Sequence, residues 1–392
     1  MKSKIKILIA QGGGPTMVIN QSLVAIIQNA KKANFEIYGS INGVNGIINN
    51  RMKTLTNMSN IKLTTIANLP GAFLGSTRDK PDKKYCKEIL KILKYKKIEK
   101  FFYIGGNDSS DSLRIISEEA EKISYCLQCI HVPKTIDNDL VMNDHTPGFG
   151  SAAKYVANLF AGINLDINSL PGIYVGVIMG RHAGFLTASS SLLRKRASDG
   201  PHLIYLPESE FRLPKFYNDI QELYNKYGKC IIAVSEGIKD NRNELISSRI
   251  TSNNETDAHG NVQLSGSGAL SDYLANQIKN KLKIKRVRAD TLGYAQRSFP
   301  NFSSEIDQKE SFEVGKMALR NSLTKKNSFS IGIIGRQQRE YKAIYGVNEL
   351  GEIAGKTKYM PKKFINKSEN GVTKSFANYA TPLIGKNLPI FT

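Results

Sequence analysis

Residues 126–139 read CLQCIHVPKTIDND, an apolar run that ends in a short polar loop. In an extended loop, residues two apart point the same way, so Thr135, Asp137 and Asp139 can line one side of a cleft. The proline at position 133 biases the chain away from a helix here. One carboxylate could then take a proton from a hydroxyl group while its neighbour helps to hold a cation. The alternative is a turn whose Asp and Asn side chains bond their own backbone.

The same design of strand and polar loop occurs twice earlier in the chain. An apolar run at 4–10 leads into QGGGPT at 11–16, and 100–104 leads into GGNDSS at 105–110; each loop is followed by apolar residues at helical spacing. Backbone N–H groups and the helix dipole make such a loop an anion site. The alternative is that the glycines only allow a tight turn. Three such units predict a parallel, doubly wound sheet whose loops converge at the carboxyl ends of the strands.

The residues beyond 150 predict a second unit of the same kind. A helical pattern over 151–168 is followed by strands at 173–179 and 229–234, and both strands end in glycine turns. With 392 residues, the chain is too long for one typical hydrophobic core. The sequence therefore predicts an α/β protein of two domains.

The composition limits the class of partner. Lysine and arginine exceed aspartate and glutamate by 55 − 34 = 21, an excess that suits nucleic acids or small anionic substrates. The lysines are scattered, however, and the densest basic run, 281–288, alternates with aliphatic residues. We expect no nucleic-acid partner. There is no apolar stretch long enough to cross a bilayer and no targeting segment, so we expect a cytoplasmic protein without a membrane partner.

Two of the four cysteines, Cys126 and Cys129, form a Cys-x-x-Cys pair. No second pair exists to complete a zinc site. In a strand, residues three apart face opposite sides, so this pair cannot close on one metal ion. We expect buried, reduced thiols.

Taken together, the loops resemble the phosphofructokinase family in order and spacing, from residue 4 to about 300. The resemblance implies two doubly wound αβα domains with mainly parallel sheets and an active site in the cleft between them. A phosphoryl-donor domain would span 1–148 plus about 298–345, and a sugar-phosphate domain 149–297 plus about 346–392. The motifs are GGGPT at 12–16, GSTR at 75–78, GGNDS at 105–109, PKTIDND at 133–139, MGR at 179–181, SEG at 235–237 and LGYAQR at 292–297.

The family resemblance implies phosphorylation of the 1-hydroxyl of fructose 6-phosphate. Asp137 would be the general base, Thr135 would lie beside the transferring phosphoryl group, and Arg78 would neutralise its charge. This agrees with phosphoryl transfer, which needs in-line positioning and charge neutralisation more than covalent chemistry. The remaining roles are Gly12 and Gly13 for the donor phosphates; Thr135, Ile136, Asp137, Met179, Gly180, Arg181 and Glu236 for the sugar; and Arg288, Tyr294 and Arg297 for its 6-phosphate.

Two positions bear on the phosphoryl donor. ATP users of this family have glycine where this chain has Asp108 and Lys134. Asp108 places bulk and negative charge where a nucleotide α-phosphate would lie, and Lys134 offers an ammonium group to a shorter donor. Both residues resemble the pyrophosphate-dependent branch of the family. We therefore expect pyrophosphate as the donor, reversible transfer, and a catalytic set that includes Asp108 and Lys134.

Three positions depart from the family pattern. Asn107 stands where many members have a magnesium-binding aspartate, and an amide oxygen is a weaker ligand for Mg²⁺ than a carboxylate. We expect Asn107 and Asp139 to hold the Mg²⁺ cofactor, with Asp108 as a further candidate. Gly172 stands about where relatives supply an arginine for the sugar phosphate. Tyr294 replaces a histidine of ATP users, which again resembles the pyrophosphate branch.

Three alternatives remain at this stage. One is an ATP-dependent 6-phosphofructokinase of the same fold, and another is a kinase for a longer sugar such as sedoheptulose 7-phosphate. The third is a catalytically silent regulatory homologue, against which the intact Asp137 argues. The resemblance also implies a homodimer or homotetramer, with Arg288, Tyr294 or Arg297 reaching in from a neighbouring subunit.

Overall fold

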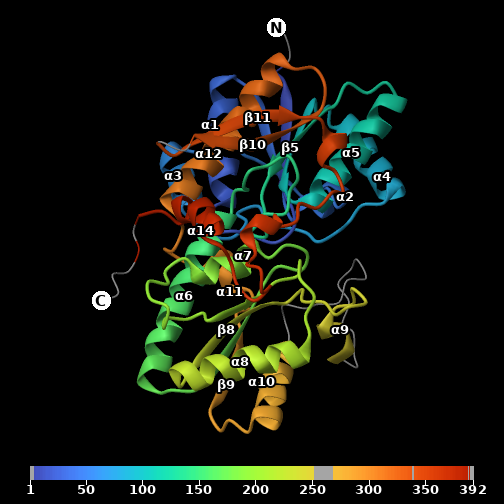
Figure 1. Ribbon diagram of the computed structural model, residues 1–392. Coiled ribbons are helices and arrows are strands. Elements are labelled where there is room, and N and C mark those ends of the chain that lie inside the picture. The colour runs from blue at the N-terminus through green and yellow to red at the C-terminus, as the bar shows by residue number, and fades with distance from the viewer. Residues whose placement is uncertain (1–3, 251–267, 338–339, 387, 389–392) are drawn as a thin grey trace. The chain divides into compact units, whose positions relative to one another are not determined.

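The computed structural model describes residues 4–250, 268–337, 340–386 and 388, and it divides into two compact units (Figure 1). The first unit consists of Met1–Ile136, Leu140–Phe149 and Arg297–Thr357. The second consists of Asp137–Asp139, Gly150–Gln296 and Lys358–Thr392.

These units differ from the predicted domains by one residue at Phe149 and at Arg297, which belong to the first unit, and by more at two other places. Asp137–Asp139 groups with the second unit, and the C-terminal part of that unit begins at Lys358 instead of about 346. The second difference has a clear cause. Strand β11 (Lys342–Asn348) pairs with a strand of the first sheet, and the Leu350 side chain after it packs into the core of the first unit.

A seven-stranded sheet forms the centre of the first unit, with strand order β11-β10-β5-β4-β1-β2-β3. The five central strands are parallel to one another, and the two edge strands are antiparallel to their neighbours. The predicted parallel sheet is confirmed. Its strands are β1 (Lys6–Gln11), β2 (Glu36–Ser40), β3 (Met52–Thr54), β4 (Lys100–Gly105), β5 (Gln128–Pro133), β10 (Phe329–Gln337) and β11.

Helices cover both faces of this sheet, as a doubly wound fold requires. Helices α1 (Ile19–Lys32), α3 (Asn60–Ala67) and α12 (Glu305–Thr324) pack on one apolar core, and Figure 1 shows α1 and α12 side by side. The opposite core is covered by α2 (Gly43–Ile48), α4 (Lys83–Tyr95), α5 (Asn107–Lys122) and α13 (Leu350–Ile353).

The second unit contains a four-stranded, all-parallel sheet in the order β7-β8-β6-β9. Its strands are β6 (Ile173–Ile178), β7 (Leu203–Tyr205), β8 (Cys230–Ser235) and β9 (Val287–Thr291). One apolar core lies between this sheet and helices α8 (Leu213–Tyr227) and α10 (Ala269–Leu282). The other helices are α6 (Phe149–Ser169), α7 (Phe185–Ala188), α9 (Ile246–Ile250), α11 (Ala295–Ser298), α14 (Lys374–Ala380) and the 3₁₀ turns Ser189–Ser191, Lys362–Phe364 and Thr381–Ile384.

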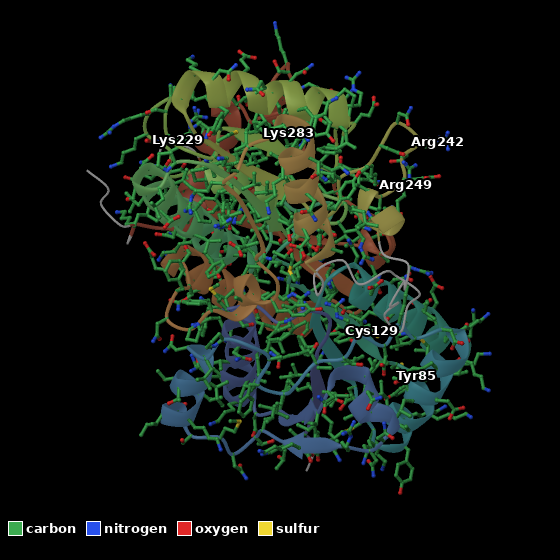
Figure 2. All side chains as sticks on the ribbon, turned by 90° about the horizontal axis from the view of Figure 1, so that it is seen from below. Tyr85, Cys129, Lys229, Arg242, Arg249 and Lys283 are labelled. Atoms are coloured by element: carbon green, nitrogen blue, oxygen red, sulfur yellow. The ribbon has the colours of Figure 1, made fainter. Side chains whose placement is uncertain are left out.

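The two cysteines of the Cys-x-x-Cys pair have different surroundings. Cys129, labelled in Figure 2, is buried on β5, and burial raises the pKa of its thiol. Cys126 precedes the strand and is exposed, so the expectation of a buried thiol was wrong there. Among the described residues, no helix combines the length and apolarity needed to cross a bilayer.

Candidate active site

The loops that follow β1, β4 and β5 meet at one edge of the first sheet. These strands are neighbours in the sheet, so their carboxyl ends lie together. Gly12 N–H donates to Ile104 O at 2.9 Å, and Lys134 N–H donates to Gly105 O at 3.0 Å. The predicted convergence of the three loops is confirmed.

The glycine loop after β1 differs in detail from the expected anion site. Helix α1 begins only at Ile19, so residues 12–18 form an irregular segment between the strand and the helix. The N–H groups of Gly12 and Gly13 already donate, to Ile104 O and Thr77 O, each at 2.9 Å. These glycines instead permit close packing: a Cβ atom on Gly12 would lie 2.5 Å from Tyr103 Oη, and Gly13 has a φ of +72°.

Lys134 supplies a buried positive charge to this edge. Its side chain is 3% exposed, and its Nζ atom donates to Gly14 O at 2.6 Å. A Cβ atom on Gly13 would lie 3.2 Å from the same Nζ atom. The ammonium group is therefore held against the backbone of the glycine loop, where a phosphate oxygen could share it.

The segment that carries Arg78 is tied to the glycine loop. Ser76 Oγ donates to Gly13 O at 2.6 Å, and Thr77 O accepts from Gly13 N–H. Further along, Tyr85 Oη donates to Asp79 at 2.9 Å; Tyr85 lies on α4 and is labelled in Figure 2. The Arg78 side chain is exposed, so a soluble anion can reach it.

Asn107 and Asp108 occupy the first turn of α5. Here the helix dipole favours an anion. Asp108 is 60% exposed and forms an ion pair with Lys80, Nζ to Oδ1 at 3.3 Å. The N-cap of this helix is Gly106, which has no side chain to cap the first turn. Ser109 instead fills the space above Gly105, where a Cβ atom would lie 2.0 Å from its Oγ atom.

Thr135 is held by the segment that returns from the polar loop. Its N–H donates to Pro147 O at 3.1 Å, and its carbonyl accepts from Thr146 Oγ1 at 3.0 Å. Gly148 N–H in turn donates to Asp307 Oδ1 on α12 at 2.9 Å. The backbone of Thr135 is therefore fixed on both sides.

Asp137 and Asp139 belong to the second unit. Between them, Asn138 has a positive φ of 59°. Its amide nitrogen donates to Tyr379 Oη at 2.7 Å, and its amide oxygen accepts from Lys358 Nζ at 3.2 Å. Asn138 is completely buried, so it anchors the turn that presents the two carboxylates.

The predicted sugar-binding residues meet at the ends of β6 and β8, which pair in parallel. Gly180 O accepts from Ser235 Oγ at 2.6 Å, and Gly180 N–H lies 3.4 Å from Glu236 Oε1. Met179 and Glu236 are 4% and 7% exposed, so both side chains are buried and not free in solvent. Burial lowers the pKa of His182, as does Arg181, while the Asp137 carboxylate opposes this, so Asp137 and Arg181 share these surroundings.

The three residues expected at the sugar phosphate are divided between the units. Arg288 on β9 and Tyr294 belong to the second unit, and Tyr294 is 51% exposed. Arg297 belongs to the first unit, and a Cβ atom on Gly14 would lie 3.3 Å from its guanidinium carbon. The structure thus places Arg297 beside the glycine loop.

Gly172 stands about where relatives supply an arginine for the sugar phosphate, and the space beside it is occupied by Arg286. A Cβ atom there would lie 2.7 Å from Arg286 O and 2.8 Å from Arg286 Cγ. Arg286 donates to Leu170 O at 3.1 Å. A side chain at 172 is therefore blocked by Arg286, the residue before β9.

Sequence reasoning missed three residues at these sites. Lys80 and Tyr103 were missed because only the tertiary structure brings them to Asp108 and Gly12. Glu208 accepts N–H bonds from Gly184 and Met360, each at 2.9 Å. Burial raises the pKa of Glu208, although those hydrogen bonds oppose it. The dipeptide Pro207-Glu208 after β7 belongs to no recognisable motif, so the sequence does not indicate that Glu208 bonds these two backbone segments.

Comparison with known proteins agrees with this geometry. The family model described as phosphofructokinase matches residues 6–319. The chain belongs to the phosphofructokinase family. A pyrophosphate–fructose 6-phosphate 1-phosphotransferase of Rhodospirillum rubrum is 52% identical over 388 residues, covering 98% of this chain and 96% of the relative. One of the same name from Xanthomonas campestris is 32% identical and covers 98% and 92%.

Among solved structures of the phosphofructokinase family, the chain is similar to the pyrophosphate-dependent phosphofructokinase from Marinobacter aquaeolei. The TM-score is 0.86 at 30% identity, and the alignment covers 99% of this chain and 94% of that one. The likeness therefore extends over both units, and the predicted fold of two αβα domains is confirmed.

Proposed function

We propose that this chain transfers a phosphoryl group from pyrophosphate to the 1-hydroxyl of fructose 6-phosphate, giving fructose 1,6-bisphosphate and phosphate. The observation that carries the proposal is the buried Lys134 ammonium at the glycine loop, together with the Asp108–Lys80 pair at the start of α5. Two relatives that match almost the whole chain, those from Rhodospirillum rubrum and Xanthomonas campestris, bear the name of this activity. The reaction is a step of glycolysis and runs in both directions.

The donor is selected by charge and room. Pyrophosphate is a compact anion, and the ammonium groups of Lys134 and Lys80 and the first turn of α5 all favour negative charge. The Asp108 carboxylate repels the further phosphate that a nucleotide triphosphate carries. Gly12 and Gly13 would line the donor site through their close packing against Tyr103 and the Lys134 ammonium group, and Arg78 neutralises charge on the group in flight.

The acceptor hydroxyl needs a base. Asp137 takes the proton from the 1-hydroxyl of the sugar. As it does so, the oxygen of that hydroxyl forms the new O–P bond, the bridging P–O bond of pyrophosphate breaks, and phosphate leaves. Thr135 lies beside the phosphoryl group, and only Ile136 separates it from the base in the chain. In the reverse direction, the protonated Asp137 returns the proton to the sugar oxygen.

The sugar is held by residues of the second unit. Met179, Gly180 and Glu236 shape the pocket at the ends of β6 and β8, and Arg181 supplies a positive charge there. Arg288 and Tyr294 take the 6-phosphate. Arg297, beside Gly14, contributes its charge from the first unit.

Magnesium fits the donor chemistry of this site in a limited way. The part of the chain that the structure describes holds no cluster of three or more His, Cys, Asp or Glu side chains for a metal ion. Mg²⁺ typically keeps several waters and binds through one or two protein oxygens plus substrate phosphates. Asn107 and Asp139 would hold it in that manner, and the ion would neutralise charge on the phosphate oxygens.

We further propose that the first unit binds the phosphoryl donor and the second the sugar phosphate. We also propose that the enzyme is a cytoplasmic homodimer or homotetramer. The division of the candidate residues between the two units supports the first statement. Resemblance to the family supports the second, and sedimentation of the purified protein tests it.

Phosphorus NMR tests the proposed function directly. Purified protein with Mg²⁺, pyrophosphate and fructose 6-phosphate should convert the pyrophosphate signal into phosphate and sugar 1-phosphate signals. Fructose 1,6-bisphosphate with phosphate should regenerate pyrophosphate. If pyrophosphate persists in the forward mixture while ATP is consumed in its place, the donor assignment fails; if neither is consumed, the protein is the silent homologue.

A further inference from the structure

A cluster of buried charged side chains lies behind the segment that returns from the polar loop. At its centre is His145, which is 2% exposed and lies between two carboxylates. Its Nδ1 atom is 2.8 Å from Asp144 Oδ1, and its Nε2 atom is 2.7 Å from Glu310 Oε2 on α12. None of these groups takes part in the mechanism above.

Each carboxylate has a second partner. Arg336 Nε on β10 donates to Asp144 Oδ1 at 2.9 Å. Tyr341 Oη donates to Glu310 Oε1 at 2.6 Å and lies 3.2 Å from His145 Nε2. The described titratable and charged groups that face His145 are Asp144 of its own segment, Glu310 of α12, Arg336 of β10 and Tyr341 between β10 and β11, with Tyr345 of β11 close to Glu310.

The hydrogen bonds fix the charge of the ring. Two donors also lie near the ring, Arg336 Nη2 at 3.3 Å from Nδ1 and Tyr341 Oη at 3.2 Å from Nε2. The carboxylate oxygens of Asp144 and Glu310 are closer, at 2.8 and 2.7 Å. Ionised carboxylates only accept, so both ring nitrogens of His145 donate to them, which only the imidazolium form can do. The cluster is then neutral, with two carboxylates balanced by Arg336 and His145. Burial lowers the pKa of His145, but the hydrogen bonds to Asp144 and Glu310 outweigh it, so that the pKa stands above its usual value.

The charged cluster includes two residues of the backbone segment 144–148, and that segment bonds the backbone of Thr135. Asp144 N–H donates to Ile333 O of β10 at 2.7 Å, and Thr146, next to His145, donates to Thr135 O. We propose that the His145 imidazolium is a positioning group that keeps residues 144–148, and through them Thr135, in the geometry needed for phosphoryl transfer. This inference rests on the proposed function, in which Thr135 lies beside the transferring phosphoryl group.

The charge of His145 makes the ordering of residues 144–148 depend on pH. A neutral His145 can donate to only one carboxylate and leaves the other as an unbalanced buried charge. The raised pKa means that the ordering contributed by the imidazolium is complete below the unfolded-state pKa, near 6.5, and is lost as the pH rises through the folded-state value. Turnover should fall over that alkaline range because Thr135 is no longer fixed.

Two variants separate charge from packing. In His145→Gln the amide can donate to only one of the two carboxylates, so kcat should fall about tenfold to a hundredfold, as a misplaced reacting group does, with little change in either KM. In His145→Gln with Glu310→Gln, the two amides can bond each other while Asp144 keeps Arg336. This double variant should recover most of the kcat and show no alkaline fall.

The control is His202→Gln in the second unit. The His202 ring accepts from Ile231 N–H at 2.9 Å and lies 3.2 Å from Ser198 O, and burial lowers its pKa to about 4, so it stays neutral. Its replacement also removes a largely buried imidazole. It should keep the alkaline fall in kcat of the wild type.

Hydrogen–deuterium exchange gives a readout that needs no substrate. In His145→Gln the peptide covering 133–150 should exchange faster than in the wild type, whereas peptides of the second sheet should not change. Unchanged exchange in 133–150, or a double variant that keeps the alkaline fall without the imidazole, overturns the proposal. If the wild type does not consume pyrophosphate, the proposed function fails, and the exchange experiment still decides whether His145 orders the segment.

Discussion

Replacing Lys134 by methionine removes one positive charge from the donor site and keeps most of the apolar stem. In the native protein this side chain is 3% exposed and its Nζ atom donates to Gly14 O at 2.6 Å. A hydrogen bond from an ammonium group to a phosphate oxygen contributes about 1.5–3 kcal/mol. At about 1.4 kcal/mol per tenfold, kcat/KM for pyrophosphate should fall about 10- to 150-fold.

The assay measures initial rates of the forward reaction in two series. In the first, pyrophosphate is varied at saturating fructose 6-phosphate, and in the second, fructose 6-phosphate is varied at saturating pyrophosphate. The loss should appear in the pyrophosphate series, while KM for the sugar phosphate stays near the wild-type value. Lys100→Met is the matched control, because Lys100 Nζ is also partly buried and donates to Gln128 Oε1 and Ser322 O, each at 2.7 Å, at the other end of β4. If Lys134→Met and Lys100→Met use pyrophosphate equally well, the donor role of Lys134 is refuted.

Three further predictions follow from the site. Asp137→Ala should lower kcat about 10²- to 10⁴-fold, the range for loss of a general base, while calorimetry still detects fructose 6-phosphate binding; near-normal turnover would remove the base assignment. Asp108→Gly removes the carboxylate that repels a longer donor, so ATP should become a stronger competitor of pyrophosphate; an unchanged inhibition constant contradicts this. Gly12→Ala places a Cβ atom 2.5 Å from Tyr103 Oη, so the free energy of unfolding should drop by about 1–3 kcal/mol; an unchanged melting temperature would contradict this steric conflict.

The central part of the first sheet was predictable because its signals are local. The strands β1, β4 and β5 are short apolar runs followed at once by glycine or polar loops, and parallel strands bring such loops to one edge. The candidate donor residues lie in those loops. Their mutual contacts, such as that of Lys134 with Gly14, follow from the strand order.

The C-terminal part of the fold was not predictable in the same way. Strand β10 joins β5 across a long stretch of sequence. Helix α12 buries Asp307 and Glu310, which weakens its apolar pattern. Those two carboxylates are buried because they bond Gly148 and His145, partners that only the folded chain supplies.

Some details of the site depended on exact backbone geometry. The N–H groups of Gly12 and Gly13 were expected to face the donor, but they donate to Ile104 O of β4 and to Thr77 O, and the helix begins only at Ile19. The ion pair of Asp108 with Lys80 joins two segments that carry no shared motif. Such contacts arise from tertiary structure and leave no periodic signal in the sequence.

The ratio of kcat/KM for pyrophosphate to that for ATP, measured with fructose 6-phosphate and Mg²⁺, tests the account most directly. We expect a ratio of several orders of magnitude in favour of pyrophosphate for the wild type, and a much smaller ratio when Asp108 and Lys134 are both replaced by glycine. A wild-type ratio of about one or below would contradict it, as would a double variant that keeps the wild-type preference.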